Sequence, residues 1–226
     1  MPDPLQRLIA GALAILSLPL VAVLAVAIRL ESSGPPIYHA ERMGREAIAF
    51  RCFKLRTMRM NSGEGPAVTV GGDSRVSRVG AILRRFRLDE LPQLWNVARG
   101  EMRFVGPRPE APRFVDLSTP LHSRVFSAVP GITGLAQLVY VDEASMLDGL
   151  DPEDTYRTTV LPAKLQLDIA YLDRRSPSLD LWILARTIGA VAGRPMDLET
   201  IEARLGVSLK HIAKTRKPPH QEDDPA

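Results

Sequence analysis

Two adjacent acids, Asp89 and Glu90, are the side chains of this 226-residue sequence that are best suited to chemistry. A carboxylate can attack a phosphoryl group, as it does in enzymes that form an aspartyl phosphate, and carboxylate oxygens are ligands that Mg²⁺ prefers. The same pair also suits the start of an ordinary helix, because Asp is a favoured cap and Glu is stabilised in the first turn. The pair alone therefore leaves a catalytic and a capping interpretation open.

Basic side chains that could hold a phosphate accompany these acids. Arg108 stands between Pro107 and Pro109, whose fixed φ angles leave it little conformational freedom to lose, and a guanidinium binds phosphate oxygens bidentately. An exposed arginine on a tight turn would give the same pattern. Lys54 and Arg56 are further candidates, although a basic strand end near a membrane also binds lipid headgroups.

The charge of the chain is distributed unevenly. Residues 29–108 hold 15 Lys and Arg against 8 Asp and Glu, whereas residues 109–226 hold 13 against 17, within a net charge of +3. We therefore expect an anionic partner to bind the first half. One cysteine and four scattered histidines exclude an internal disulfide and a cysteine-based metal site, and they favour a reducing compartment.

An apolar segment precedes the basic region. Residues 8–28 contain no charged side chain, and about 20 apolar residues are enough to cross a bilayer as a helix. Pro19 predicts a bend, since proline removes a backbone donor, and Ser17 can supply a hydroxyl there. A cleaved signal peptide, a kinked spanning helix and a re-entrant hairpin remain open. The basic residues that follow predict a cytoplasmic location for the next part of the chain.

Two helices are expected to position the acids. Ser74 is a candidate cap for a helix that begins at Arg75 and whose arginines are mostly solvated. The buried stripe of this helix would consist of Val76, Val79, Ile82, Leu83 and Phe86. Pro92 is tolerated in a first turn, so a second helix is expected to begin at Asp89 and to run through Val97. The two acids would then lie at a helix N-terminus.

The remaining pattern is less specific. It predicts short strands at 37–38 and 47–53, a glycine-rich lid or connector at 63–72, and helices at 156–173 and 179–191. Pro162 should break the first of these helices locally. The second is amphipathic, and Trp182 suits either a membrane interface or the core. Residues after 208 are polar and are expected to be disordered.

Several ordered motifs resemble those of the bacterial sugar transferases, the monotopic phosphoglycosyl transferases. The motifs are RVSRVG at 75–80, LDELPQLWNV at 88–97, VGPRP at 105–109, KLRTM at 54–58, PGITGLAQ at 130–137, LDIAY at 167–171 and SLDL at 178–181. The resemblance spans about residues 5–192. Two places depart from it. The family commonly has Gln-x-Arg-x-Gly where AERMG stands at 40–44, and Trp where Ala136 stands. These departures bear on local contacts and on sugar preference.

The resemblance implies a compact α/β domain, rich in helix with a small sheet, that carries a re-entrant membrane helix at its N-terminus and interfacial amphipathic helices. It divides the chain into a membrane-inserted helix-break-helix at 1–30, a catalytic domain at 31–193 and a C-terminal extension at 194–226. Longer members of the family carry an additional multi-helix membrane domain, and this sequence is similar to the short form.

The resemblance also implies an activity, the two-step transfer of a sugar-1-phosphate from a UDP-sugar to polyprenyl (undecaprenyl) phosphate. Asp89 matches the nucleophile that expels UMP and forms a covalent phosphosugar intermediate. Glu90 matches a ligand of the Mg²⁺ cofactor, and Asp89 is the second candidate ligand. The candidate substrate-binding residues are Arg108, Lys54, Arg56, Arg85, Gln137 and Asp168.

The expected partners are the UDP-sugar donor, the polyprenyl phosphate acceptor and membrane lipids. The expected location is the cytoplasmic face of the bacterial inner membrane, in a first membrane step of a glycoconjugate or exopolysaccharide pathway. Oligomeric state stays open, with a homodimer as one alternative. An adaptor without catalysis would leave Asp89 and Glu90 as solvated caps. A nucleic-acid binder would use the helix at 75–87, but that helix lacks interleaved aromatic side chains, so we expect no nucleic acid.

Overall fold

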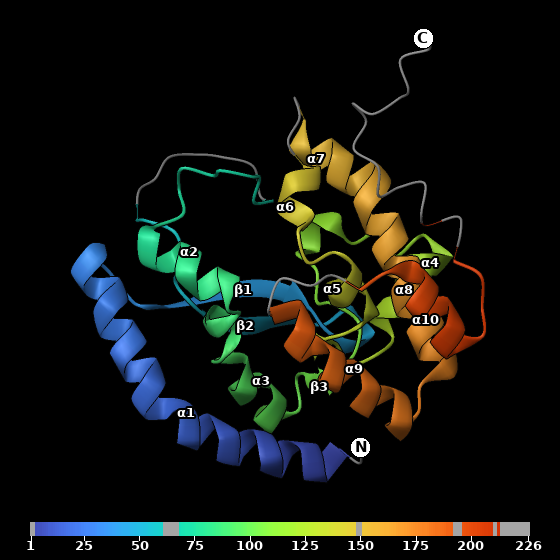
Figure 1. Ribbon diagram of the computed structural model, residues 1–226, viewed down its shortest axis with the longest axis horizontal. Helices are drawn as coiled ribbons and strands as arrows, with labels where there is room; N and C mark the ends of the chain where they lie inside the picture. The colour runs from blue at the N-terminus through green and yellow to red at the C-terminus, as the bar shows by residue number, and fades with distance from the viewer. Residues whose placement is uncertain (1–2, 61–67, 148–150, 192–195, 210–211, 213–226) are drawn as a thin grey trace.

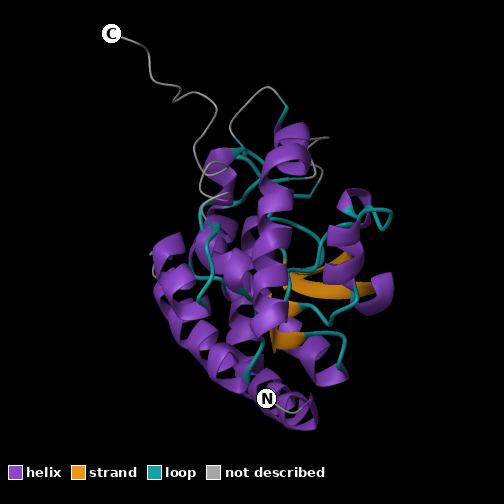
Figure 2. Ribbon diagram, turned by 90° about the vertical axis from the view of Figure 1, so that its right-hand side faces the viewer, coloured by secondary structure: helices purple, strands orange, loops and turns teal. Residues whose placement is uncertain are grey.

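Helices dominate the fold and enclose two small sheets (Figure 1, Figure 2). The structure is a computed structural model that describes residues 3–60, 68–147, 151–191, 196–209 and 212. The architecture confirms the predicted class, a helix-rich α/β domain with little sheet and one apolar helix at the N-terminus.

The bounds of the elements are as follows. The α-helices are α1 (Asp3–Glu31), α2 (Arg78–Arg85), α3 (Gln93–Arg99), α4 (Pro120–Phe126), α5 (Leu135–Val139), α6 (Glu143–Met146), α7 (Pro152–Thr155), α8 (Leu161–Arg174), α9 (Pro177–Val191) and α10 (Leu198–Leu205). Short turns of 3₁₀-helix are η1 (Arg45–Ala47), η2 (Leu88–Glu90) and η3 (Pro112–Phe114), and η4 (Tyr156–Val160) is a π-helical turn. Strand β1 (Ile37–Met43) pairs antiparallel with β2 (Ala49–Leu55), and β3 (Arg103–Val105) pairs parallel with β4 (Gly131–Thr133).

Helix α1 is long and apolar enough to enter a membrane, and it contains Pro19. Figure 1 shows it as two arms with a bend between them, running along the lower edge and then up the left side of the view. Ser17 Oγ donates a hydrogen bond to the carbonyl of Ala14 at 2.8 Å, within the turn that precedes the proline. A proline inside a helix removes one backbone hydrogen bond and bends the axis, so the bend agrees with the expectation from the sequence.

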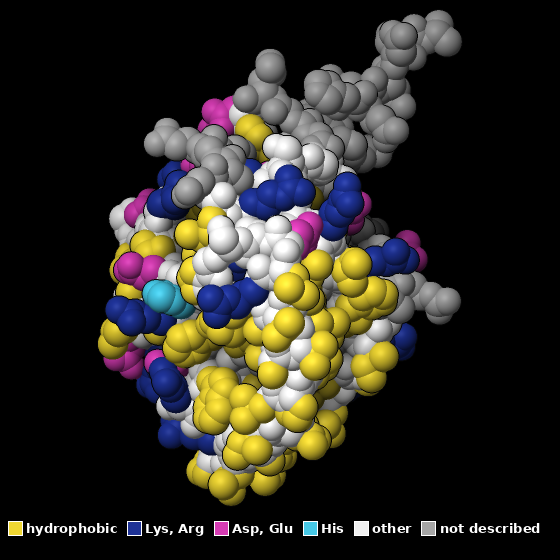
Figure 3. All heavy atoms as spheres, turned by 90° about the vertical axis from the view of Figure 1, so that its left-hand side faces the viewer, with side chains coloured by type: hydrophobic (Ala, Val, Ile, Leu, Met, Phe, Trp, Pro, Cys, Tyr) yellow, Lys and Arg dark blue, Asp and Glu magenta, His cyan; other side chains and the backbone are white. Residues whose placement is uncertain are grey.

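One side of α1 packs on the domain. In the first arm Ala10 and Ala14 are buried, and their small side chains allow α3 to approach closely. In the second arm Ile28 packs with Leu55 and Leu83. The other side exposes large apolar side chains, which are Leu5, Leu8, Leu13, Ile15, Leu16, Leu18, Leu20, Val23, Val26 and Leu30. Figure 3 shows apolar side chains gathered over the lower part of this face, with basic side chains above and beside them.

Asn96 fixes α3 against β2. This side chain is fully buried. Its amide nitrogen donates to the carbonyl of Arg51 at 2.7 Å, and its Oδ1 accepts from the backbone N–H of Phe53 at 3.1 Å. Because Lys54 follows on the same strand, these bonds set the position of Lys54 relative to the turn that precedes α3.

The main core lies between the C-terminal helices. Its most deeply buried side chains include Leu135 of α5, Leu167 of α8, Ile183 of α9 and Ile201 of α10. Helix α10 begins in the segment that the resemblance assigns to a C-terminal extension, and Ile201 joins it to the core of the main domain. The sequence pattern did not indicate this helix.

The predicted helix at Arg75 begins three residues later than expected. Ser77, not Ser74, caps α2, because the Ser77 hydroxyl accepts from the backbone N–H of Gly80 at 2.9 Å. The backbone of Arg75 forms its hydrogen bonds outside the helix, because its N–H donates to the Asp73 side chain and its carbonyl accepts from the N–H of Arg59. Of the predicted stripe, Leu83 is fully buried, whereas Ile82 and Phe86 are 57% and 48% exposed. The buried face of α2 includes Gly80, so it is rotated from the expected one.

Other expectations fare better. Both predicted strands exist as β1 and β2. The break expected at Pro162 takes the form of the π-helical turn η4, after which Pro162 lies in the first turn of α8. The predicted helix at 179–191 is α9, where Trp182 is half-buried. Residues 61–67 of the predicted loop lie outside the described residues, as do 210–211 and 213–226 of the tail. The disorder expected after residue 208 is wrong for Leu209 and Ile212, which are buried in the main core.

Candidate functional site

The two acids lie on the 3₁₀ turn η2, directly before α3 rather than inside it. Arg87 precedes the turn with a backbone φ of +56°, a left-handed conformation that is uncommon for residues other than glycine. Pro92 is the N-cap of α3. The predicted helix from Asp89 to Val97 is therefore divided into a turn that carries the acids and a helix that follows. Asp89 is buried, with 7% of its surface exposed, which is contrary to a solvated cap.

Lys54 pairs with Glu90. Its Nζ lies 2.9 Å from Glu90 Oε1, and the two side chains are 20% and 11% exposed. Burial alone would raise the pKa of Glu90, but the charges of Lys54, Arg108 and Arg87 outweigh it and hold this pKa at about 2. Glu90 is therefore ionised throughout the physiological range.

Asp89 behaves differently from its neighbour. Burial raises its pKa above the usual range, and the nearby charge of Glu90 raises it further. Lys54, Arg84 and Arg87 oppose this shift without overcoming it. The two adjacent acids thus have pKa values moved in opposite directions, a pattern that is common where carboxyl groups take part in chemistry.

Two glycine-containing motifs meet to present Arg108. Gly106 donates its N–H to the carbonyl of Thr133 at 3.0 Å, and Gly131 donates to that of Pro107 at 2.8 Å. A Cβ on Gly131 would come within 2.1 Å of the nitrogen of Gly106, so the backbones can approach only without a side chain there. The Gly-Pro-Arg-Pro and Pro-Gly-Ile-Thr-Gly segments, far apart in sequence, therefore form one rigid support.

The charge of Arg108 is directed toward acids. Burial alone would lower its pKa, but Glu90, Glu143 and Glu110 raise it above its ordinary value. The backbone N–H of Arg108 donates to Asp168 Oδ2 at 3.4 Å. The structure thus brings together Lys54, Arg108 and the two acids, as the sequence predicted.

Behind Arg108 lies a buried ionic cluster. Lys164 Nζ is 3.3 Å from Glu110 Oε1 and 2.9 Å from Glu143 Oε2, and it donates to the hydroxyl of Tyr156 at 2.9 Å. Burial alone would raise the pKa of Glu110, but Lys164 and Arg108 lower it. Sequence reasoning missed Lys164, although its position four residues before Asp168 on one helix was a usable signal.

Asp168 lies beside this cluster and is buried on α8. Burial raises its pKa to about 8. Its Oδ1 has no hydrogen-bond partner among the described residues. Asp168 therefore supports the backbone of Arg108 and prefers its protonated form.

Two other predicted substrate-binding residues lie elsewhere. Arg56 is buried, and its guanidinium donates to the carbonyls of Ser33 and Ser32 at 2.7 and 2.5 Å, so it fixes the turn after α1. Arg85 is exposed and stacks on Phe86 at 5.7 Å. Neither is among the charges that chiefly shift the pKa of Asp89 or Glu90.

Arg84 takes the place that was expected of Arg85. Its Nε donates to Thr57 Oγ1 at 2.8 Å and its other nitrogen to Thr69 Oγ1 at 3.0 Å. It also lowers the pKa of Asp89. The helical pattern did not distinguish the two arginines, because the buried face of α2 is rotated from the predicted stripe.

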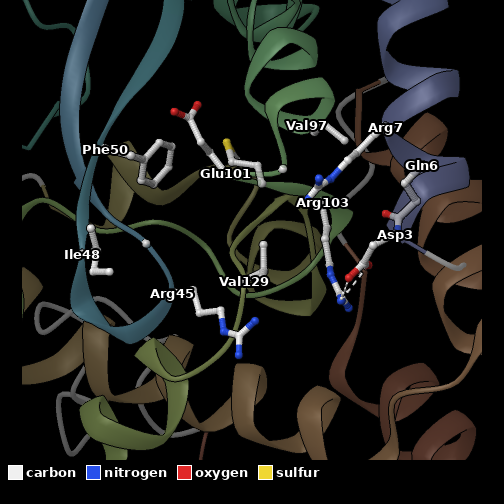
Figure 4. A pocket seen from close by; sticks show the side chains of 13 residues that line it. Asp3, Gln6, Arg7, Arg45, Ile48, Phe50, Val97, Glu101, Arg103 and Val129 are labelled. Carbon is white, nitrogen blue, oxygen red and sulfur yellow. Dashed lines mark hydrogen bonds and ion pairs between the residues drawn. The ribbon is translucent and has the colours of Figure 1, made fainter.

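Two cavities flank α3. One of about 150 Å³ is lined by residues that include Arg87, Glu90 and Gln137. Figure 4 shows the other, of about 220 Å³, between the first turn of α1, the β1–β2 hairpin and the C-terminal end of α3. There Arg103 points to Asp3, and the two side chains form an ion pair at 2.7 Å. Of these two cavities, the first is the one that reaches the acid pair, through Glu90.

Asp89 and Glu90 are also candidate ligands for a metal ion. Among the described residues no group of three or more His, Cys, Asp or Glu side chains is placed to hold a metal ion. Mg²⁺ usually binds one or two protein carboxylates and takes its remaining ligands from phosphate and water. Oxygens of Glu90 and Asp89, with Lys54 on a single Glu90 oxygen, fit that requirement when a diphosphate supplies the other ligands.

The chain belongs to the bacterial sugar transferase family, because the sequence model of that family matches residues 4–194. It is 39% identical over 184 residues to a UDP-glucose:undecaprenyl-phosphate glucose-1-phosphate transferase of Caulobacter vibrioides, covering 79% of this chain and 65% of that protein. It is 38% identical over 177 residues to a UDP-N-acetylgalactosamine-undecaprenyl-phosphate N-acetylgalactosaminephosphotransferase of Aeromonas hydrophila, covering 76% and 39%. It is 36% identical to the exopolysaccharide production protein PSS of Rhizobium leguminosarum bv. phaseoli, covering 75% and 84%. The chain thus spans less than two thirds of the first two relatives.

Proposed function

We propose that this protein transfers a sugar-1-phosphate from a UDP-sugar to undecaprenyl phosphate and releases UMP. The observation that carries the proposal is the buried Asp89 beside the ion pair of Glu90 and Lys54, with Arg108 near enough to Glu90 for their charges to shift each other's pKa. The names of the relatives, which act on UDP-sugars and undecaprenyl phosphate, support the same substrates. The relatives differ in the sugar, so the sugar is not part of the proposal.

The proposed chemistry has two steps. An oxygen of the ionised Asp89 attacks the phosphorus that bears the sugar, the bond from that phosphorus to the bridging oxygen breaks, and UMP leaves with the electron pair. A phosphate oxygen of the acceptor then attacks the same phosphorus and breaks its bond to Asp89, which restores the carboxylate. Each step exchanges one P–O bond for another, and positioned carboxylates are competent nucleophiles for it.

The surrounding cations suit a diphosphate. Arg108 is held on a rigid loop and can bind phosphate oxygens bidentately, while Lys54 can move from Glu90 to a phosphate oxygen. Glu90 and Asp89 would hold Mg²⁺, which when bound neutralises the phosphate oxygens that would otherwise repel a carboxylate. Arg84 and Arg87 stabilise the ionised form of Asp89.

The proposal also includes a re-entrant membrane helix. The N-terminal end of α1 is tied to the domain by Asp3 and Arg103. Its C-terminal end is tied by Glu31, whose two oxygens accept the N–H groups of Arg78 and Val79 at 2.7 and 2.9 Å. A helix that crossed a hydrocarbon core of about 30 Å would place these ends on opposite sides. The bent α1 with its exposed apolar face suits entry and exit through one leaflet, on the cytoplasmic side.

This arrangement would bring the substrates together. The reactive phosphate of a polyprenyl phosphate stays at the bilayer surface, and a nucleotide sugar is supplied from the cytosol. A domain held at that surface by α1 can bind both. A membrane-bound adaptor without catalysis would not need the opposed pKa shifts of Asp89 and Glu90.

The test is UMP release by the detergent-purified full chain with Mg²⁺, undecaprenyl phosphate and a panel of UDP-glucose, UDP-galactose and UDP-N-acetylgalactosamine. We expect release with at least one donor, its loss in Asp89→Asn, and a weaker, altered Mg²⁺ dependence in Glu90→Gln. Asp116→Asn is the matched control, because Asp116 is exposed and bonds only to its own turn and His122 among the described residues. Full activity in Asp89→Asn would contradict the covalent route.

A further inference from the structure

The cavity beside Glu90 has a mostly apolar wall. Its apolar side chains are Leu91, Leu94, Ile132, Leu138, Ala190 and Val191. The hydroxyls of Thr133 and Thr187 also line it, but they bond to each other at 2.8 Å, and Thr187 donates to the carbonyl of Ile183. These hydroxyls are therefore largely satisfied within the protein.

Gln137 is the exception in this wall. Its side chain is 7% exposed, and neither its Nε2 nor its Oε1 has a hydrogen-bond partner in the described part of the chain. Buried amide groups are almost always hydrogen-bonded, because an unmade bond leaves their desolvation uncompensated. Gly134 leaves room for the amide, since a Cβ there would come within 2.9 Å of Oε1. Gln137 thus contributes to this apolar wall a donor and an acceptor that the described protein leaves unpaired, and both atoms are shielded from bulk solvent.

We infer that Gln137 binds two neighbouring hydroxyls of the donor's sugar ring, while the apolar wall packs against the C–H groups of that ring. The inference rests on the proposed function. A carboxamide presents a donor and an acceptor in one plane, and each hydroxyl of a vicinal pair can act as either. An apolar lining with a few placed polar groups is typical of small-molecule sites. The cavity is smaller than the roughly 300–1,000 Å³ of sites that enclose a whole drug-sized ligand, which suits a single ring.

Reach favours the sugar over the other parts of the substrates. The sugar is joined through one oxygen to the phosphorus that Asp89 attacks, and Glu90, the next residue, lines the cavity. The uracil base lies farther away, beyond the second phosphate and the ribose. The first isoprene unit of the acceptor is also near the reaction, but a hydrocarbon would leave the Gln137 amide unpaired.

The test compares binding of UDP-sugar with binding of UDP. Asp89→Asn serves as the background so that no turnover occurs, and titration calorimetry measures both dissociation constants with Mg²⁺. The donor is whichever of UDP-glucose, UDP-galactose and UDP-N-acetylgalactosamine the wild-type protein uses fastest. Adding Gln137→Met should weaken binding of this donor roughly 10- to 100-fold, as expected for two hydrogen bonds, and should leave UDP binding unchanged. Gln166→Met is the matched control, because Gln166 lies on α8 outside the cavity.

Several outcomes distinguish the possibilities. Equal weakening of UDP and UDP-sugar would assign Gln137 to the nucleotide and overturn the inference, as would unchanged binding of both. If Gln137→Met alone, assayed for turnover with Asp89 intact, changed only the KM for undecaprenyl phosphate, the inference would be overturned in favour of the lipid. A donor that lacks one of the two hydroxyls should bind the Asp89→Asn protein more weakly than the intact donor does, and adding Gln137→Met should then weaken its binding by a smaller factor, because one hydrogen bond rather than two remains to be lost. If the wild-type protein binds neither UDP nor UDP-sugar, the proposed function itself fails.

Discussion

Replacing Lys54 by methionine should move the acid limb of the pH–rate profile to higher pH. Lys54 is the leading favourable charge acting on both acids, and its Nζ lies 2.9 Å from Glu90 Oε1 in a pair that is largely shielded from water. Methionine keeps much of the length of the side chain and removes the charge. Burial, which alone would raise the pKa of both Glu90 and Asp89, would then be less opposed.

The size of the expected pKa change follows from the ion pair between Lys54 and Glu90. Two unit charges about 4 Å apart interact by roughly 4 kcal/mol at an effective dielectric constant of about 20, and a pKa change of one unit corresponds to about 1.4 kcal/mol. The pKa of Glu90 is held at about 2, compared with 4.5 for an ordinary glutamate, by Lys54 together with two arginines. We therefore expect the loss of Lys54 to raise the pKa of Glu90 by about one unit or more, and to raise the pKa of Asp89 as well.

The direction in which the acid limb moves follows from the role of the carboxylates in the reaction. The carboxylates must be ionised to act, so activity falls as the pH falls through their pKa values, and raising those values moves the fall upward. The assay is kcat for UMP release between pH 4 and 9 in Lys54→Met, with Lys54→Arg as the control that keeps the charge. Superimposable acid limbs in wild-type protein and Lys54→Met would refute the electrostatic coupling.

Three further predictions concern stability, measured by denaturant or thermal unfolding. Because burial raises the pKa of Asp168 to about 8 in the folded protein, the unfolded chain releases this proton first and stability falls between about pH 4 and 8. Asp168→Asn should therefore be the more stable protein at pH 8, with the difference vanishing near pH 4; a constant difference would refute this. Lys164→Met removes the cation from two glutamates and should cost about 3–5 kcal/mol, so a cost under about 1 kcal/mol, the median for a surface pair, would count against a buried cluster. Gly80→Ala would place a Cβ 2.0 Å from the carbonyl of Thr57 and should cost about 1–3 kcal/mol or more; Gly189→Ala, with open space around it, is its control and should be neutral or stabilising.

The sequence predicted the chemical centre better than its supports. Asp89, Glu90, Lys54 and Arg108 could be found because their motifs are local and because residue type states what each can do. The meeting of Gly106 with Gly131 depends on the pairing of strands that are 28 positions apart, which no local pattern encodes. The motifs include both glycines, but they do not indicate that the backbones of these two glycines lie against each other.

The wrong predictions on α2 have a common physical cause. Hydrophobic periodicity fixed a stripe on α2 that includes Ile82 and Phe86, yet both are exposed. The close approach of Gly80 to the backbone of Thr57 decides instead which face is buried, and it turns Arg84 rather than Arg85 toward the site. Arg56 was predicted to bind substrate, but its buried guanidinium donates hydrogen bonds to backbone carbonyls instead. The sequence does not distinguish these two uses of an arginine.

The central claim is that Asp89 forms a covalent bond to the sugar-bearing phosphorus. The most direct measurement mixes the protein with UDP-sugar and Mg²⁺ in the absence of undecaprenyl phosphate, quenches the mixture rapidly, and measures both UMP and the intact mass. A covalent route predicts up to one equivalent of UMP per protein and a matching mass increase of one sugar phosphate on the peptide that contains Asp89. No UMP and no adduct without the acceptor, followed by normal turnover when the acceptor is added, would contradict it.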